Sequence, residues 1–320
     1  MTYNEIIQWL LKGDVSIQYQ VHRDLLHTSR PELLTKIEKS GWGRTYISLR
    51  NKDGHWGRGF YQPKWTSTHY TLLDLKDLSI SPRCTAATET VQIILANEKG
   101  IDGGLNPSGT IKSSDVCING MALNYCSYFK AKPEQLKSII DFLLSQHMAD
   151  GGFNCRSNRS GAHHSSLHTT LSVLEGIHEY AINNYTYRLA ELQQAAKEAR
   201  EFILLHRLFK SDKTGRVIDK KMLALHFPTR WRYDLLRALD YFRIAGIRYD
   251  NRMDDAIEEI LKKRNKENLW NLAAHYPGAQ HFKMEEAGKP SRWNTLRALR
   301  VLNHFTGVQG YTHPYDTNLA

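Results

Sequence analysis

GHWGRG at residues 54–59, DGGL at 102–105 and DGGF at 150–153 are three copies of one glycine-rich turn. They recur about every 48 residues, a period that indicates a protein built from repeated structural units. Each turn is followed by a polar loop and then by a segment whose apolar residues recur at helical spacing. These segments are TSTHYTLLDL from Thr66, SSDVCINGMAL from Ser113 and SSLHTTLSVL from Ser165.

Two weaker copies of the repeat follow in the second half of the chain. TRWRYDLLRAL starts at Thr229 and SRWNTLRALRVL at Ser291, and their preceding turns are degraded to TGRV near Gly215 and NLW near Trp270. A second amphipathic helix is expected between each of the helical segments above and the next turn. The clearest cases are residues 82–97, 133–147, 187–208 and 251–263.

The repeat predicts a single all-α domain over residues 1–320. We expect an N-terminal helical hairpin at 1–28 that breaks near Gly13-Asp14, five hairpin repeats at 29–305 and a tail at 306–320. An open solenoid and a closed ring both fit two helices per repeat, but HEAT solenoid repeats usually have about 40–47 residues. The long loop after each turn therefore favours a closed α/α toroid, with the starts of its inner helices pointing into a shared apolar pocket.

Composition excludes several classes of protein. With 41% hydrophobic and 10% aromatic residues the chain can bury a sizeable core, and no apolar run approaches the roughly 18 residues of a membrane helix. The N-terminus lacks the features of a secretory signal, so a soluble, cytoplasmic protein is expected, with Cys84, Cys117, Cys126 and Cys155 as thiols or ligands. The net charge of +10 suits an anionic ligand, but no nucleic-acid-binding motif is present.

The DGGL and DGGF turns with their helices resemble the repeats of the prenyltransferase and squalene-cyclase (terpenoid cyclase) superfamily. The closest motif resemblance is to protein prenyltransferase β subunits, which bind catalytic zinc through Asp-x-Cys at one inner helix and His at the next. Asp115, Cys117 and His168 stand at those places. The resemblance implies a zinc site at these residues, a diphosphate contact at Lys112 and an additional partner subunit, which the sequence itself does not indicate.

The residues alone also allow a metal site, because a catalytic zinc takes three ligands from Cys, His and Asp. Aligning the helix starts puts His69, Cys117, His168 and Arg232 at matching positions, where a closed ring would bring them to one cavity. His164 shares a helix face with His168. Structural roles compete: Asp115 is a good N-cap, Cys117 can be a small buried hydrophobe, and His168 can be a core histidine.

Arginines gather at the start of the last two inner helices. Arg230 and Arg292 are candidates for holding an anion, since a guanidinium binds phosphate or carboxylate through two nitrogens. The alternative is a stabilising role, in which these arginines stack on Trp231 and Trp293. The other members of the group are Arg232, Arg237, Lys289 and Arg297.

Three functions compete at this point. The first is a zinc-dependent, prenyltransferase-like enzyme that acts on an isoprenoid diphosphate or a similar lipid-like anion. The second is a non-catalytic binding or scaffold protein on a degenerate toroid. The third is a carbohydrate-active enzyme, which requires paired carboxylates in an open cleft. The helix starts offer only Asp115 and Asp234 as acids, and no catalytic residue is assigned.

Overall fold

The computed structural model describes residues 1–108, 110–155 and 161–306. The described part is all-helical, with isolated β-bridges and no strand. Most of the predicted tail, at 307–320, lies outside the described residues. The α-helices are α1 (Tyr3–Leu11), α2 (Val15–Asp24), α3 (Pro31–Ile37), α4 (Gly41–Ser48), α5 (Thr68–Asp77), α6 (Thr85–Asn97), α7 (Val116–Tyr128), α8 (Pro133–Ser145), α9 (Leu167–Ile182), α10 (Leu189–Leu205), α11 (Leu235–Ile244), α12 (Asp254–Lys262) and α13 (Arg292–Thr306).

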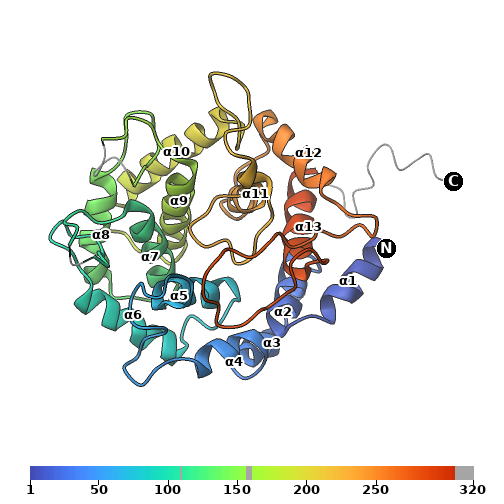
Figure 1. Cartoon of the computed structure of the whole chain (residues 1–320), viewed down its shortest axis with the longest axis horizontal. Helices are drawn as coiled ribbons and strands as arrows, with labels where there is room; N and C mark the ends of the chain where they lie inside the picture. Colours follow the sequence, from blue (N-terminus) through green and yellow to red (C-terminus); the bar gives the residue numbers. More distant parts are fainter. Residues whose placement is uncertain (109, 156–160, 307–320) are drawn as a thin grey trace.

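The helices lie in two layers around a common centre (Figure 1). The inner layer contains α2, α5, α7, α9, α11 and α13, and the chain passes to an outer helix between one inner helix and the next. Contacts lead from α5 through α7, α9, α11 and α13 to α2, and then through α4 back to α5. The first and last inner helices are therefore neighbours, although they lie at opposite ends of the sequence.

The predicted second helices are confirmed as α6, α8, α10 and α12, each within or close to its expected range. Helices α1 and α2 lie in the range predicted for the N-terminal hairpin, with Gly13 between them and Asp14 as the N-cap of α2. Its carboxylate accepts a hydrogen bond from the N–H of Ser16 at 2.8 Å. No helix in the described ranges is long and apolar enough to cross a membrane.

The glycine-rich turn occurs five times with the same hydrogen bonds. In each, the N–H of the first residue donates to a carbonyl four or five residues later, and this ties the two arms of the turn together. A residue with positive φ, such as Gly103 at 85° or Asn268 at 65°, closes the turn. The pairs are Asn51 with His55, Gly100 with Gly104, Met148 with Gly152, Ser211 with Arg216, and Asn265 with Leu269. The two degraded copies thus keep the geometry of the other three.

A polar side chain near the start of an inner helix binds the buried residue after the turn. Asn119 of α7 accepts from the N–H of Leu105 at 2.6 Å and donates to its carbonyl at 3.0 Å. Threonines do the same for two aromatic residues. These further pairs are Thr68 with Trp56 and Thr170 with Phe153, while Thr295 accepts from the N–H of Trp270. Each such contact supplies partners to backbone groups that are buried away from water.

This contact also sets the register between repeats. Cys117 lies two residues before Asn119, and His168 lies two residues before Thr170. In the first repeat the residue two positions before Thr68 is Thr66. His69 lies one residue after Thr68. The predicted equivalence of His69 with Cys117 and His168 is therefore wrong by three residues, close to one helical turn, because the sequence alignment matched helix starts rather than turn contacts.

Helices α7 and α9 pack closely because each carries a glycine at their contact. A Cβ on Gly176 would lie 2.3 Å from the carbonyl oxygen of Gly120, and a Cβ on Gly120 would lie 2.8 Å from the backbone of Ser172. Neither position has room for a side chain, so this pair of inner helices has a shorter separation than larger residues would allow.

We expect Asn119→Ala to lower the free energy of unfolding by about 2–4 kcal/mol, because it leaves two buried backbone groups of Leu105 without partners. Urea denaturation followed by circular dichroism measures the change. Asn97→Ala, at an exposed helix end, is the matched control and should change stability by less than about 0.5 kcal/mol. Equal stability of the two variants would show that the Asn119 contact does not hold the turn.

Candidate functional site

A cavity of about 520 Å³ lies among the inner helices. Its lining comes mainly from the C-terminal halves of α2, α5, α7, α9 and α11, together with α13 and the loop before α11. Figure 1 shows the long segments before α11 and α13 crossing the centre of the molecule. The expectation that the helix starts would face the pocket is therefore wrong for this cavity.

The lining is charged, where the sequence predicted an apolar pocket. Six carboxylates and seven cationic side chains line it. The carboxylates are Asp24, Asp74, Asp77, Glu175, Glu179 and Asp240, and the cations are Arg23, Lys76, Arg230, Arg237, Arg243, Arg297 and Arg300. Charges buried in this way are costly unless they are paired, so their pairing decides which of them is available to a ligand.

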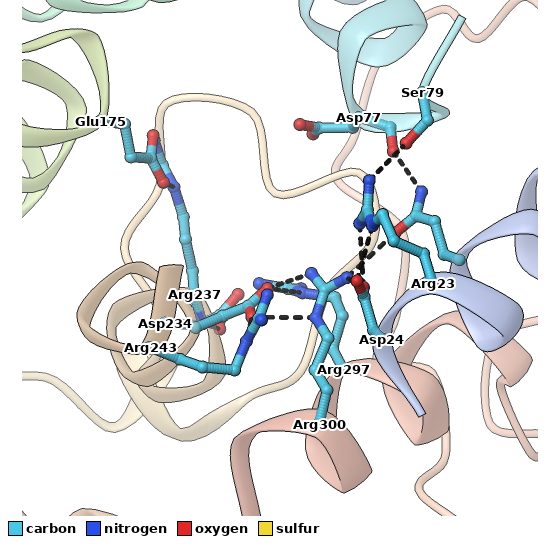
Figure 2. Close-up of polar contacts among 12 residues, drawn as sticks. Arg23, Asp24, Asp77, Ser79, Glu175, Asp234, Arg237, Arg243, Arg297 and Arg300 are labelled. Carbon is cyan, nitrogen blue, oxygen red and sulfur yellow. Dashed lines mark hydrogen bonds and ion pairs between the residues drawn. The ribbon is translucent and has the colours of Figure 1, made fainter. Parts of the chain in front are cut away.

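Asp77, the last residue of α5, is the exception to this pairing. Its carboxylate makes no hydrogen bond within the described ranges, although its backbone carbonyl accepts from Gln20 at 2.8 Å. Figure 2 shows the carboxylate pointing away from Arg23. Burial raises the pKa of Asp77 to about 6, and the nearby carboxylates of Glu175 and Asp74 add to the shift. A carboxyl group that titrates near neutral pH is suited to proton transfer.

Glu175 of α9 lies on the same cavity and is held by Arg237 of α11. The guanidinium donates Nε to Glu175 Oε1 at 2.8 Å and Nη2 to Oε2 at 2.6 Å, a two-point ion pair. Arg237 also donates to the carbonyl of Arg232 at 2.7 Å, so its position is fixed by the loop before α11. This geometry holds Glu175 as an oriented carboxylate.

Lys76 of α5 and His178 of α9 line the cavity as well. Lys76 pairs with Glu179 at 3.2 Å, which links α5 to α9. His178 lies beside Glu179, and burial lowers the pKa of His178, so its imidazole is neutral at pH 7. Together with Asp77 and Glu175, these side chains place acids, a base and a cation around one space.

Of the three predicted anion-binding residues, only Arg230 lines the cavity. Its Nη1 donates to Asp74 at 2.6 Å, and Tyr46 donates to the same carboxylate at 2.8 Å. Arg292 instead lies over the ring of Trp9, at 4.5 Å from its centroid. Lys112 is exposed in the loop before α7. The three residues do not form one site.

The predicted zinc residues are held by other contacts. The N–H of Cys117 donates to the sulfur of Cys155 at 3.1 Å, and Thr169 donates to the same sulfur at 3.5 Å. Asp115 is the N-cap of α7. A hydrogen bond to Cys155 and burial raise the pKa of the Cys117 thiol, which opposes the thiolate that zinc requires. The contribution of Cys155 was not predicted, because the thiol follows a turn rather than a helix start.

His168 faces a different environment. Its Nδ1 accepts the N–H of Tyr233 at 2.8 Å, and its ring lies 5.2 Å from that of Trp231. Burial lowers the pKa of His168 to about 4, with Arg237 and Arg232 adding to the effect. No three metal-ligating side chains of His, Cys, Asp or Glu gather in the part of the chain that the structure describes. The residues as placed do not fit a zinc ion, and the zinc site stays a prediction.

The remaining candidates are dispersed. His69 is buried, with Nδ1 at 3.3 Å from the Tyr125 hydroxyl, and burial lowers its pKa to about 3. His164 is exposed. Arg232 lies over the rings of Trp231 and Tyr276 at 4.9 and 4.8 Å, which fits the stacking role considered for these arginines.

No protein-family model matches this chain, and a search of characterised proteins finds no match either. The function is therefore argued from the geometry of the cavity.

We expect Asp77→Asn to stabilise the protein at pH 8 by about 1–3 kcal/mol, the order implied by a pKa raised from 3.8 to about 6. Between pH 4 and 6 the folded form binds more protons at Asp77 than the unfolded form, so its contribution to stability falls as pH rises. The advantage of the variant should disappear near pH 4. Urea denaturation at both pH values measures it, and an equal difference at pH 4 and 8 would contradict the raised pKa.

Proposed function

We propose that the chain is an α/α toroid whose central cavity binds a small, hydroxyl-rich molecule, such as a short saccharide, and carries out acid–base chemistry on it. The fold assignment is supported by the alternation of inner and outer helices and by the circuit of contacts through α13, α2 and α4. The function is carried by one observation: the carboxylate of Asp77, which has no hydrogen-bond partner in the described ranges, lines the same charged cavity as the oriented carboxylate of Glu175.

The lining favours a polar ligand over an isoprenoid. An apolar isoprenoid chain would displace the water that binds the carboxylates and guanidiniums of the lining. It offers these groups no hydrogen bonds in return, so its binding costs free energy. Sugar hydroxyls both donate and accept, and their apolar faces pack on aromatic rings. Tyr70, Tyr128, Tyr241 and Trp293 supply such rings on the same lining. The volume of about 520 Å³ lies within the usual range of ligand pockets and does not favour a purely structural scaffold.

The proposed chemistry assigns one role to each carboxylate. Asp77 gives its proton to the oxygen of the departing sugar as the glycosidic bond breaks. Glu175, kept in place by Arg237, accepts a proton from the attacking water. Two carboxyl groups with different surroundings are the usual requirement for glycoside hydrolysis. The zinc-dependent transferase gains no support, because the cavity is charged and Asp115, Cys117 and His168 do not form a ligand set.

We expect Asp77→Asn to lower kcat on a neutral methyl glycoside by at least about 100-fold with little change in KM, because an alkoxide leaving group needs a proton and a general acid contributes about 10²–10⁴ to the rate. Release of free sugar from a panel of methyl α- and β-glycosides is the assay, and the wild-type rate should fall as pH rises through about 6, the pKa of Asp77.

Asp212→Asn, at an exposed position outside the cavity, is the matched control and should retain the wild-type rate. Binding of each glycoside is followed separately by saturation-transfer NMR. The proposal fails if no glycoside binds, or if Asp77→Asn turns over a glycoside as fast as the wild type does.

A further inference from the structure

The side of the cavity between α2, α11 and α13 carries a cluster of four arginines and two aspartates (Figure 2). Asp240 of α11 lies at its centre. It accepts Nε of Arg243 at 2.9 Å, Nε of Arg300 at 2.9 Å and Nε of Arg297 at 3.5 Å, and Nη2 of Arg300 as well. Burial opposes the charge on Asp240, but the three guanidiniums more than offset this and lower its pKa.

All three guanidinium nitrogens donate hydrogen bonds in both Arg300 and Arg23. Arg300 bridges Asp240 and Asp24, at 2.8 Å from the latter, and also donates to Gln20 at 3.0 Å. Arg23 makes a two-point pair with Asp24 at 2.6 and 2.9 Å. Arg300 therefore joins α13 to α2 and α11, while Arg23 orients Asp24 within α2 and its Nη1 donates to Ser79 after α5 at 3.4 Å. Both arginines thus have a structural role.

Arg243 and Arg297 differ from them. Each reaches Asp240 through Nε alone, and neither Nη1 nor Nη2 donates a hydrogen bond to any group in the described ranges. Both residues line the cavity, and Arg297 is only 6% exposed. The terminal nitrogens of both residues are accessible to solvent, and both side chains line the cavity. Terminal guanidinium nitrogens without a partner in a cavity are donors available to a ligand.

The net charge of the cluster also favours an anionic ligand. Four arginines meet two aspartates, which leaves an excess of two positive charges on this side of the cavity. Asp234 lies close by, but its Oδ2 is enclosed and its side chain does not line the cavity. Arg297 is near enough to the proposed acid to lower the pKa of Asp77, so this one arginine of the cluster lies toward Asp77.

We propose that Arg243 and Arg297 bind an oxyanion carried by the ligand, either a carboxylate or a phosphate. This rests on the proposed function, and makes the ligand an acidic saccharide: a sugar whose hydroxyls face Asp77 and Glu175 and whose anionic group contacts the two guanidiniums. Guanidiniums suit both oxyanions, because their parallel N–H groups match the oxygens of each.

The test is calorimetric titration of the full chain with D-glucuronate, D-glucose 6-phosphate, D-glucose and inorganic phosphate. We expect at least one of the two anionic sugars to bind more than tenfold tighter than glucose, and the one that binds tighter identifies the oxyanion. In the double variant Arg243→Gln/Arg297→Gln, the anionic sugar should bind no tighter than glucose. The affinity for glucose itself should change less than about twofold. Arg252→Gln, which removes a guanidinium outside the cavity, is the control and should keep the preference.

Equal wild-type affinity for glucose and both anionic sugars overturns the oxyanion site and leaves the saccharide proposal standing. A third outcome is that phosphate binds to the wild type but not to the double variant, and that no sugar binds to either. This result supports the oxyanion site and overturns the saccharide proposal. If the double variant does not fold, the wild-type comparison of glucuronate with glucose still decides, since it needs no variant. Retention of the full preference in a folded double variant also overturns the proposal.

Discussion

The hydrogen-bonding needs of one buried residue after four of the five described turns constrain the rest of the structure. Trp56, Leu105, Phe153 and Trp270 are almost fully enclosed, and their backbone groups must find partners inside the protein. A side chain near the start of the next inner helix binds each of them. The turn, the loop and the inner helix are thereby fixed relative to one another in these four repeats.

That register has a consequence at the opposite ends of the same helices. Because the starts of the inner helices are tied to the turns, their C-terminal halves converge around the cavity without being tied by similar contacts. Charged residues at these ends pair across helices instead: Lys76 pairs with Glu179, and Glu175 pairs with Arg237 from the first turn of α11. Polar contacts near the helix starts therefore hold the fold, and ion pairs near their ends form the site.

The helical architecture was predictable because its signals are local. Spaced apolar residues and recurring glycines specify α6, α8 and the turns whatever the rest of the chain does. The cavity was not predictable in this way. Asp77, Glu175 and Asp240 lie on three different helices, and a single charged residue near a helix end looks like a solvated residue when it is considered alone.

One signal of the site was present in the sequence. Arg237 and Arg297 belong to the arginine group noted at the last two inner helices, and both line the cavity. The structure assigns them different roles, which no spacing could show: Arg237 is occupied by Glu175, while Arg297 keeps its terminal nitrogens unpaired. At Cys117 and His168 the contacts likewise could not be read from spacing, since they come from Cys155 in the loop after a turn and from Tyr233 just before α11.

The number of charges around the cavity argues for use by a ligand rather than for stability. Replacing a buried ion pair by apolar side chains of similar volume is often neutral or stabilising. The ion pairs of Arg300 with Asp24 and Asp240 have a structural explanation, because they join α13 to α2 and α11. Arg243, Arg297 and Asp77 have none, because their free atoms bond to no protein group in the described ranges. Their partial desolvation costs stability, and an interaction of these free atoms with a bound molecule would recover it.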